Sequence, residues 1–555
     1  MNAIGLGAGA AGLTIAAGLE SDNVLIIEAG NDFQLPKSPL SSKLASTVNN
    51  IPIISPLLQL QDLFDWQYRT QPQAHACKAL TNRVSHWPMG KGFGGTQLIN
   101  NMIYHRGHEN DYRDWFDTST QDYNYSRDIL PFFIEYESFI ELSDLRSKTK
   151  LADAFIHSES QSTFGDIEFR SFQRPKVMQY NGRRWTSADS YHLKNNSLHQ
   201  IIVNAKVERI LFDDDAIDTK TTTQTTTASM KAVGVSYRKY GRIHDVRATK
   251  AVILSSGTIG TPTILLKSGI GPENLYSHNV NKSHKDPSSA RKNPLKIELR
   301  KHLAAVGENL QDHITTGMDL IQLNRTLGME PWNLYTLQNV FQYFWNGIGP
   351  LTMTGCEGLG FIRTKNAKIG DKYTIDNTPD LGFMVMPMGS TIDAGVYFRR
   401  VLNINEQTWQ EYFQPLIGLP TISILPIVLH PKSRGIVTIR LSGDDEIETI
   451  IQPNYLSHSD DVDVLVAGLK ILMKLMKTAP FKTIGASIPD IKFPGCTQNE
   501  FGSDEYWRCY AKHLTLTAYH PVGTCRMGAI KMIRSLIRQH SKFMGSNIYI
   551  FVMHR

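Results

Sequence analysis

The hydrophobic residues at the start of the chain form two short runs on either side of a segment rich in glycine and alanine. The runs Ala3 to Leu6 and Val24 to Ile27 are continuously apolar, which is typical of buried parallel strands. Between them, Leu13 to Leu19 is apolar and rich in alanine, which favours a helix. The pattern therefore predicts strand, helix and strand over residues 3–28, the opening unit of a nucleotide-binding α/β fold.

The predicted turn between the first strand and the helix contains Gly7, Gly9 and Gly12 in the spacing G-x-G-x-x-G. In that motif the first glycine permits the turn, the second lets the backbone approach a pyrophosphate, and the third lets the helix pack on the strand. The pyrophosphate is expected at the positive end of the helix. Glu28 follows the second strand, about 20 residues past the first glycines, where a carboxylate can accept hydrogen bonds from a ribose. The motif predicts a dinucleotide site and does not by itself separate FAD from NAD.

The middle of the chain contains further segments with strand composition, separated by a threonine-rich loop. The strand-like segments are Ile201 to Asp213, Ala232 to Tyr237, Arg242 to Ala248 and Lys250 to Leu254. Small residues after the last of these strands, from Ser255 onward, leave space for a ligand. Thr261 and Pro262 are predicted as the N-cap and first residue of a helix that ends at Ser268.

The second half of the chain contains two helical patterns and one hairpin. Tyr335 to Leu351 has helical apolar spacing, and its Phe, Tyr and Trp residues are expected to face the core. Leu429 to Gly435 opens a hairpin, in which His430 is predicted as a turn residue, and Asp461 to Met476 is amphipathic. A chain of 555 residues predicts two domains around a cleft. No apolar run reaches the roughly 18 residues of a membrane span.

Charge and cysteine content exclude some classes of function. The net charge of +6 is concentrated in two segments, because residues 281–302 hold seven Lys/Arg and two acids (+5) and residues 531–555 hold five Lys/Arg and no acid (+5). Two isolated basic segments do not form the basic surface that nucleic acid requires, so no nucleic-acid partner is expected. The five cysteines lack metal-site spacing, and their odd number leaves at least one thiol free if a disulfide forms.

Two further glycine-containing segments are specific enough to indicate a family. The segment from Gly90 to Asn100 resembles the first signature of the glucose–methanol–choline (GMC) oxidoreductases, with Phe93 and Gln97 as departures. The segment Gly257 to Gly271 is similar to the second signature at every defined position. Two signatures in the right order favour this family, and its insect glucose dehydrogenase-like branch, over NAD-dependent Rossmann enzymes.

The resemblance implies a fold and a cofactor. It implies an α/β (α+β) chain with a Rossmann-like FAD-binding domain from residues 1–112, 198–318 and 505–555. The substrate domain, 113–197 and 319–504, is expected to be an antiparallel sheet flanked by helices. The residues that the resemblance places against FAD are Gly94, Gly95, Thr96, Asn100, Val207 and Gly257, in addition to Gly7, Gly9, Gly12 and Glu28. Of these, Asn100 is expected to face the flavin ring, and Val207 is expected to contact the adenine end through its backbone.

His520 is the candidate catalytic residue. Pro521 restricts its backbone to an extended conformation, and the surrounding Tyr-His-Pro-x-Gly-Thr resembles the active-site segment of the family. A neutral imidazole can accept a hydroxyl proton at physiological pH. The predicted reaction is oxidation of a CH–OH group of a small alcohol or sugar. The hydride goes to flavin N5, the proton to His520, and the electrons to a quinone-like acceptor or oxygen.

The resemblance ends after Gly528, where the family continues with a strand, a flavin-binding turn and a His or Asn that partners the catalytic histidine. None of this is recognisable in residues 529–555, so no second catalytic residue is assigned, and the chain is interpreted as truncated. Residues 281–302, which lack an apolar face, precede the family segment Val306 to His313 as a surface insertion or a mistranslated piece of the gene. The alternative hypothesis is therefore a catalytically inactive paralogue or an incomplete gene product. The family implies secretion, whereas no signal peptide precedes the nucleotide motif.

Overall fold

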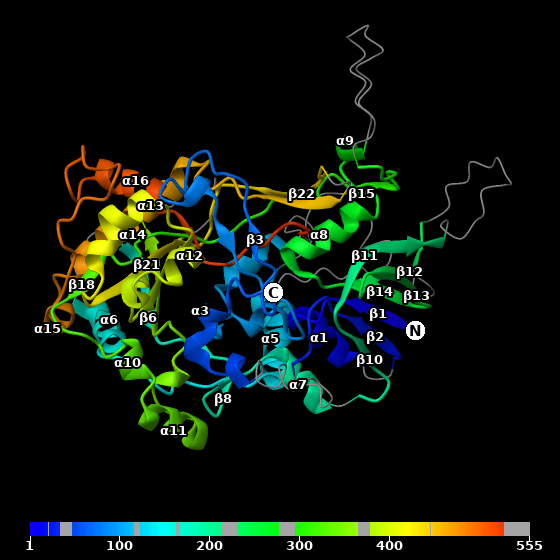
Figure 1. Cartoon of the computed structure of the whole chain (residues 1–555), viewed down its shortest axis with the longest axis horizontal. Coiled ribbons are helices and arrows are strands. Elements are labelled where there is room, and N and C mark those ends of the chain that lie inside the picture. Colours follow the sequence, from blue (N-terminus) through cyan, green and yellow to red (C-terminus); the bar gives the residue numbers. More distant parts are fainter. Residues whose placement is uncertain are drawn as a thin grey trace, which may run out of the picture.

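The computed structural model describes residues 1–19, 22–33, 47–115, 123–161, 167–194, 196–213, 230–276, 295–364, 378–443 and 446–526. Two groups of elements are visible in Figure 1, one around the strands β1, β2, β10 and β14 near the N-terminus and one around β21 and the helix α14. Both groups contribute to the candidate site described below. No helix in these described ranges has the length and apolar character needed to cross a bilayer.

The first group is a parallel sheet in the order β10 (Gln200–Ile202), β2 (Val24–Ile27), β1 (Ala3–Leu6) and β14 (Ala251–Leu254). The strands β1, β2 and β14 consist of buried or nearly buried residues, which explains their continuous apolar composition. The helix α1 (Ala10–Gly18) connects β1 and β2, so the predicted strand, helix and strand are confirmed.

The predicted strand at 201–213 is two strands in different sheets. It changes direction at Asn204, which has a left-handed φ of +54°, and continues as β11 (Ala205–Phe212). The strand β11 pairs with β12 (Ala232–Lys239), which pairs with β13 (Arg242–Arg247), in an antiparallel sheet. A composition-based prediction cannot detect this break, because asparagine tolerates the left-handed region without any change in hydrophobicity.

The helix after β14 starts earlier than predicted. The helix α8 runs over Gly257–Lys267 with Ser256 at its N-cap, so Pro262 lies inside the helix and Thr261 is not a cap. Proline cannot donate to the carbonyl four residues before it, which is that of Thr258. The hydroxyl of Thr524 donates to this carbonyl at 2.6 Å, so a partner from the far end of the chain satisfies it.

The described part of the basic segment 281–302 packs on this first group of elements. Leu295 is buried among apolar residues of the nucleotide region, with Ile297 and Leu299 packed beside it. The strand β16 (Lys301–His302) pairs in parallel with β15 (Ile270–Gly271). The expectation that this segment lacks an apolar face is therefore wrong for residues 295–302, and residues 277–294 lie outside the described ranges.

The second group is an antiparallel sheet of eight strands. Six follow the order β24 (Ala486–Ser487), β18 (Ile321–Leu323), β21 (Thr421–Val428), β20 (Leu381–Met386), β19 (Gly358–Thr364) and β6 (Ile167–Gln173). The helix α14 (Ser459–Leu475) packs against β21, and α6 (Lys150–Gln161) packs against β6, β19 and β20. This arrangement has the antiparallel sheet and flanking helices that the resemblance implied.

Two short strands place the candidate catalytic segment on this sheet. The strand β17 (Ile314–Thr315) pairs with both β21 and β25 (Leu516–Thr517). Residue 311 bridges to residue 522 further along, so residues 311–315 run antiparallel to residues 516–522. Both segments lie in the ranges predicted for the FAD-binding domain, and β17 pairs with β21, which lies in the range predicted for the substrate domain.

The remaining helices and strands are shorter or connect the two groups. They are α3 (Ser55–Leu58), β3 (Tyr68–Arg69), β4 (His86–Trp87), β5 (Ile103–Tyr104), α4 (Tyr125–Asp128), α5 (Leu130–Phe139), β7 (Lys176–Val177), β8 (Gln179–Tyr180), β9 (Arg183–Arg184), α7 (Ser187–Lys194), α9 (Glu273–Tyr276), α10 (Pro331–Leu334), α11 (Leu337–Asn346), α12 (Phe398–Leu402), α13 (Glu406–Thr408), β22 (Ile436–Leu441), β23 (Ile447–Gln452), α15 (Ala479–Thr483) and α16 (Asp504–His513). The strands β22 and β23 form the predicted hairpin.

One predicted helix turns its apolar side to solvent instead of to the core. The helix α11 forms within the predicted range, but the apolar residues Leu337, Phe341, Phe344 and Trp345 are exposed, and only Tyr343 on this helix is buried. The expectation that its aromatic residues face the core is therefore wrong for all but Tyr343. Helical spacing shows that residues share a face of a helix, and it does not show what that face meets.

Candidate active site

The predicted nucleotide turn needs its glycines for contacts within the protein as well as for a ligand. Gly7 has a φ of +95°, and a Cβ at this position would lie 2.8 Å from the Ser255 carbonyl oxygen. A Cβ at Gly12 would lie 2.1 Å from the Gly7 carbonyl oxygen. At Gly9 a Cβ would meet no atom closer than the Gly95 Cα at 3.9 Å. Gly7 therefore lets the turn approach the backbone that follows β14, and Gly12 lets α1 approach the end of β1. The surroundings of Gly9 leave room for a ligand.

Glu28 is a buried carboxylate that accepts backbone donors from two loops. Its Oε2 accepts the Ala8 N–H at 2.8 Å, and its Oε1 accepts the Gly30 N–H at 2.8 Å. Burial raises the pKa of this carboxyl, against the lowering effect of the backbone donors. Glu28 also lines the cavity described below, so its carboxylate lies where a ligand hydroxyl can approach it.

The second glycine loop lies directly on the first. A Cβ at Gly95 would lie 2.7 Å from the Gly9 Cα, and the Gly94 N–H donates to the Ala8 carbonyl at 2.7 Å. Gly94 and Gly95 have φ values of +117° and +59°, in the left-handed region that favours glycine. The carbonyl of Thr96 accepts the Asn100 N–H at 3.1 Å, which closes a turn that leads to Asn100.

The side chain of Asn100 is oriented by donors on its oxygen. Its Oδ1 accepts the Met102 N–H at 3.0 Å and an N–H of the Arg184 guanidinium at 2.9 Å. Because these two bonds use both acceptor positions of the oxygen, the amide NH₂ is the group that Asn100 presents elsewhere. Asn100 lines the cavity described below, so this arrangement supports a hydrogen-bond donor toward a cavity ligand.

Arg184 supports the loop that carries Asn100, and sequence reasoning missed it. It is 2% exposed and donates to the carbonyls of Gln97 at 2.7 Å and Asn100 at 2.9 Å, and to that of Asn49. Burial lowers the pKa of its guanidinium to about 9, against the raising effect of Asp189. The residue sits in a hairpin without any motif, so the sequence carries no signal that it supports the loop 97–100.

The two departures from the first family signature are accommodated by α5 and α7. Phe93 is buried and its ring packs against the rings of Tyr191 and His192. Gln97 accepts the Ser187 N–H at 2.8 Å and donates to the Tyr136 hydroxyl at 3.2 Å. Phe93 does not line the cavity, so its bulk takes no space from a ligand there.

One cavity of about 3330 Å³ connects the nucleotide turn with His520. The predicted site residues that line it are Gly7, Gly9, Glu28, Gly95, Thr96, Asn100, Val207, Gly257 and His520. Gly12 and Gly94 do not line it. Both lie on the side of the glycine turns that contacts the protein. Pockets for drug-sized ligands have roughly 300–1,000 Å³, so this volume is large enough for a dinucleotide together with a substrate.

His520 is paired with a second histidine that sequence reasoning did not assign. The Nδ1 atoms of His520 and His313 are 3.0 Å apart, and Nε2 of His313 is 3.1 Å from the Leu429 carbonyl oxygen. A carbonyl can only accept, so Nε2 of neutral His313 carries the hydrogen and its Nδ1 carries a lone pair. Nδ1 of neutral His520 must then donate, which places the lone pair of His520 on Nε2.

A buried carboxylate anchors the backbone of His520. Asp312, 4% exposed, accepts the His520 N–H at 2.9 Å through Oδ1 and the Thr517 hydroxyl at 2.7 Å through Oδ2. The Tyr455 hydroxyl donates to the same Oδ2 and accepts the Trp87 indole N–H at 3.0 Å. Burial and the charge of Asp312 raise the pKa of Tyr455 well above its ordinary value, so Tyr455 remains a donor.

The residue before His520 has a strained backbone. Tyr519 has a φ of +61°, a conformation that is uncommon for residues with bulky side chains. Its N–H donates to the Thr517 hydroxyl at 2.7 Å, and the Pro521 carbonyl accepts the Thr258 hydroxyl at 2.7 Å. Strain of this kind persists where surrounding contacts hold it, and it is concentrated at functional sites.

His430 has more contacts than its predicted role as a turn residue suggested. It lines the same cavity, and its Nε2 lies 2.9 Å from the Asp111 carboxylate. Burial lowers the pKa of this imidazole, but the hydrogen bond and charge of Asp111 outweigh burial and leave the pKa raised. The raised pKa favours the protonated form of His430 beside the Asp111 carboxylate at the cavity wall.

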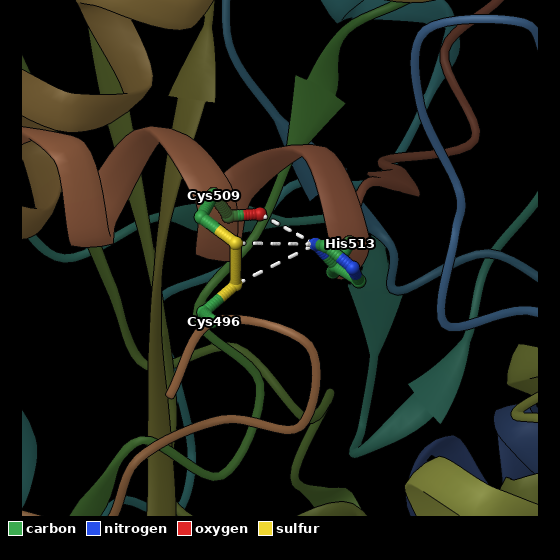
Figure 2. Close-up of side chains that lie close together, drawn as sticks. All are labelled: Cys496, Cys509 and His513. Carbon is green, nitrogen blue, oxygen red and sulfur yellow. Dashed lines mark hydrogen bonds between the residues drawn. A yellow bond between two sulfur atoms is a disulfide. The ribbon is translucent and has the colours of Figure 1, made fainter. Parts of the chain in front are cut away.

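Cys496 and Cys509 form a disulfide beside His513 (Figure 2). Nδ1 of His513 lies 2.9 Å from the Cys509 carbonyl, so the ring donates within α16. The other cysteines, Cys77, Cys356 and Cys525, are free thiols, which confirms the expectation from their odd number. Although the three groups in Figure 2 lie close enough to hold a metal, both sulfurs are used in the disulfide, which ties α16 to the preceding loop.

Comparison with known proteins identifies the class to which this fold and site belong. Residues 1–315 match the N-terminal part and residues 431–546 the C-terminal part of the GMC oxidoreductase family profile. The chain therefore belongs to the GMC oxidoreductases, a family of FAD-dependent flavoenzymes, which confirms the predicted family, fold class and cofactor. The second match extends past Gly528 to residue 546, so the expectation that the resemblance ends after Gly528 is wrong.

Several characterised proteins are similar over most of their length. Glucose dehydrogenase [FAD, quinone] of Drosophila melanogaster is 28% identical over 94% of this chain and 77% of its own. Alcohol dehydrogenase [acceptor] of Pseudomonas putida is 27% identical over 94% and 85%. Choline dehydrogenase, mitochondrial, of Mus musculus is 26% identical over 97% and 82%.

Solved structures share the fold at lower sequence identity. Pyridoxine 4-oxidase from Mesorbium loti has a TM-score of 0.67 at 21% identity, covering 96% of this chain and 89% of its own. Formate oxidase from Aspergillus oryzae RIB40 has a TM-score of 0.70 at 20% identity, covering 95% and 89%. At these identities the similarity extends to the fold and carries no information about substrate.

Proposed function

We propose that this protein oxidises a CH–OH group of a small alcohol or sugar with FAD, that His520 accepts the hydroxyl proton, and that the electrons pass to a quinone. The observation that carries the proposal is the placement of His520 on the same cavity as both glycine loops. The relatives named for glucose, alcohol and choline support a CH–OH donor. Two of those names, with quinone and acceptor in them, support an acceptor other than a nicotinamide.

The residues that line the cavity fit FAD. The space beside Gly9 at the start of α1 suits the pyrophosphate, which the positive end of a helix attracts. Glu28 can accept a ribose hydroxyl, and the amide NH₂ of Asn100 can donate to the flavin edge. When bound, the flavin supplies a hydride acceptor, which no side chain provides.

The two histidines supply the proton chemistry. With Nδ1 of His520 directed at His313, Nε2 carries the lone pair that takes the substrate hydroxyl proton. The imidazolium that results keeps its hydrogen bond to Nδ1 of His313, and His313 remains held by the Leu429 carbonyl. His313 therefore keeps the His520 ring in one orientation and one tautomer before the reaction, and it solvates the positive charge afterwards.

The buried Asp312 favours the charged product of this proton transfer. Its carboxylate accepts the backbone N–H of His520 at 2.9 Å, so its negative charge lies beside the backbone of this residue. A nearby opposite charge stabilises an imidazolium. Asp312 thereby fixes the position of His520 through the backbone and makes proton uptake more favourable.

The test uses the purified protein reconstituted with FAD. Glucose, choline, aliphatic alcohols and aromatic alcohols are mixed with it anaerobically, and bleaching of the flavin absorbance is followed by stopped flow. We expect bleaching with at least one of them, and we expect His520→Ala to slow it by about a hundredfold or more. The matched control is His244→Ala, an exposed histidine on β13. A colourless protein would support the inactive paralogue, and a wild-type rate in His520→Ala would remove His520 from the mechanism.

A further inference from the structure

The helices α10 and α11 carry a continuous apolar surface that is turned away from the protein. Leu337, Phe341 and Trp345 are spaced at four residues along α11 and are 90%, 60% and 77% exposed. We define the aromatic face as these three residues together with Trp332, Tyr335, Phe344 and Ile348, each of which is exposed. Singly exposed apolar residues need no explanation, but a contiguous patch of this size marks an interaction surface.

The helix that carries this face is held firmly by its opposite side. Tyr343 is 4% exposed, and its hydroxyl donates to the Asn50 carbonyl at 2.8 Å. The Thr336 hydroxyl caps the N-terminus by accepting the Asn339 N–H at 3.2 Å, and Gly347, with a φ of +63°, ends the helix. Because α11 is capped and docked in this way, the outward orientation of its apolar stripe is a feature of the native packing.

The charges around the aromatic face are arranged unequally. Residues 331–350 contain no Asp, Glu, Lys or Arg. At the C-terminal end of α11, Arg146 donates to the Gly347 carbonyl at 3.3 Å. The turn between β8 and β9 packs against the same carbonyl, since a Cβ on Gly182 would lie 2.3 Å from it, and the next residue is the exposed Arg183. Two exposed arginines therefore lie beside the uncharged aromatic surface at this end, and the acidic Glu330, which accepts the Asn333 amide N–H at 2.8 Å, lies at the start of α10.

The aromatic face is separate from the candidate active site. None of its seven side chains lines the large cavity. In Figure 1 the helix α11 lies at the lower edge of the molecule, with α10 just above it. A large partner bound to the aromatic face would therefore leave the large cavity open to a small substrate.

We propose that the aromatic face binds the surface of a lipid bilayer that contains anionic lipid. Tryptophan and tyrosine favour the interface between headgroups and hydrocarbon, and helices with Trp, Phe and Leu on one face lie in that interface plane. The absence of charge over residues 331–350 removes the cost of burying an ion there. Arg146 and Arg183 can reach lipid phosphates at its rim, as arginine side chains near an interface do.

This inference rests on the quinone acceptor of the proposed function, because a lipid-soluble quinone is met at a membrane. Binding through α10 and α11 holds the reduced enzyme where such an acceptor is dissolved, while the hydrophilic substrate still enters from water. The expected consequence is that electron transfer to a quinone embedded in vesicles depends on the aromatic face, whereas electron transfer to a water-soluble acceptor does not.

The test measures co-flotation of the FAD-loaded protein with vesicles made of equal parts phosphatidylcholine and phosphatidylglycerol. We expect the double variant Phe341→Gln/Trp345→Gln to lower vesicle partitioning by about tenfold or more. The matched control replaces two other exposed apolar residues, Leu193→Gln/Tyr240→Gln, which are 74% and 82% exposed, and should bind as the wild type does. We expect Arg146→Gln/Arg183→Gln to weaken binding to these vesicles and to leave the weaker binding to pure phosphatidylcholine unchanged.

Each outcome of this test decides the proposal. Unchanged flotation of Phe341→Gln/Trp345→Gln, or absence of flotation of the wild type, overturns it. Light scattering that shows a dimer lost only in that double variant, without vesicle binding, assigns the face to a second copy instead. Anaerobic flavin bleaching by the alcohol in the absence of vesicles is measured in parallel. If bleaching occurs without vesicle binding, the membrane proposal fails while the proposed function stands. If vesicle binding occurs without bleaching, the membrane proposal stands while the proposed function fails.

Discussion

His520 and His313 face each other through like atoms, with their Nδ1 nitrogens 3.0 Å apart. One of the two nitrogens must donate and the other must accept, and the Leu429 carbonyl next to Nε2 of His313 decides which. When both rings are neutral, His520 therefore carries its hydrogen on Nδ1 and its lone pair on Nε2. This relationship makes His313 a positioning residue for the proposed proton acceptor, although it comes from a distant part of the chain.

The first prediction concerns His313. His313→Leu removes the acceptor for Nδ1 of His520, so both tautomers of His520 become accessible and the imidazolium loses a partner. We expect flavin reduction to fall by about ten- to a hundredfold. We also expect the pH at which the rate rises to shift to lower pH, since an imidazolium without a hydrogen-bond partner has a lowered pKa and the neutral base is then present at lower pH. Anaerobic stopped-flow reduction measured as a function of pH checks both effects.

The conservative variant His313→Asn separates positioning from simple packing. Its Oδ1 can occupy nearly the place of Nδ1 and accept the His520 N–H, so most of the rate and the original pH profile should return. If His313→Leu and His313→Asn have the same rate and the same profile, the hydrogen bond between the rings has no role in the reaction.

The second prediction concerns the buried guanidinium of Arg184. Arg184→Met leaves the carbonyls of Asn49, Gln97 and Asn100 without this donor. Each unsatisfied buried acceptor costs about 1–3 kcal/mol, partly offset by not burying a charge, so we expect the free energy of unfolding to fall by about 3 kcal/mol. Urea unfolding measures the loss, and FAD titration should show weaker binding because Asn100 loses its orientation.

The neighbouring residue provides the control for this variant. Arg183→Met changes the same residue type one position earlier, where the side chain is exposed, and should alter stability by no more than about 0.5 kcal/mol. Equal stability of the two variants would show that the bonds of Arg184 contribute nothing net.

The third prediction concerns pH and Glu357. Burial raises the pKa of this carboxyl from 4.5 to about 7, although the Thr149 N–H and hydroxyl both donate to it at 2.7 Å. Between these two pH values the folded state keeps the proton that the unfolded state has lost, so the free energy of unfolding falls as pH rises through this window and levels off above it. The contribution is about 3 kcal/mol in total.

Comparison with Glu357→Gln isolates this contribution. Glutamine retains an acceptor for the Thr149 N–H and does not titrate, so the difference in unfolding free energy between wild type and variant should grow in favour of the variant from pH 4.5 to pH 7. Urea unfolding at intervals across this range measures it. A difference that is constant with pH would mean that the carboxyl titrates normally.

The fourth prediction concerns the disulfide in Figure 2. Cys496 and Cys509 are 13 residues apart in the sequence, and closing a loop of about this length stabilises a protein by about 3 kcal/mol. We expect Cys496→Ala/Cys509→Ala to lose about that amount and to melt at a lower temperature. A thiol reductant should lower the melting temperature of the wild type and leave that of the double variant unchanged. A wild type that is insensitive to full reduction would contradict this role for the bridge.

Local patterns in the chain were enough to bring the predicted nucleotide residues together on one cavity. Gly7, Gly9 and Glu28 lie within a single strand–helix–strand unit, so their spacing along the chain nearly determines their spacing in space. The same holds for Gly95 to Asn100 within one turn. The start of α8 was missed because the carbonyl that Pro262 leaves without a donor is satisfied by Thr524, which is far away in the sequence.

The sequence by itself determined the family, the FAD dependence and the identity of the candidate base, because each of these is written in contiguous motifs. Only the tertiary structure decided that His313 is the partner of His520, that Asp312 and Arg184 hold the two halves of the site, and that the stripe on α11 faces outward. The physical reason is that these features depend on how distant segments such as β17 and β25 come together. Local hydrophobicity and propensity do not show which side chains pair across such segments. They also do not show which side of a helix meets solvent.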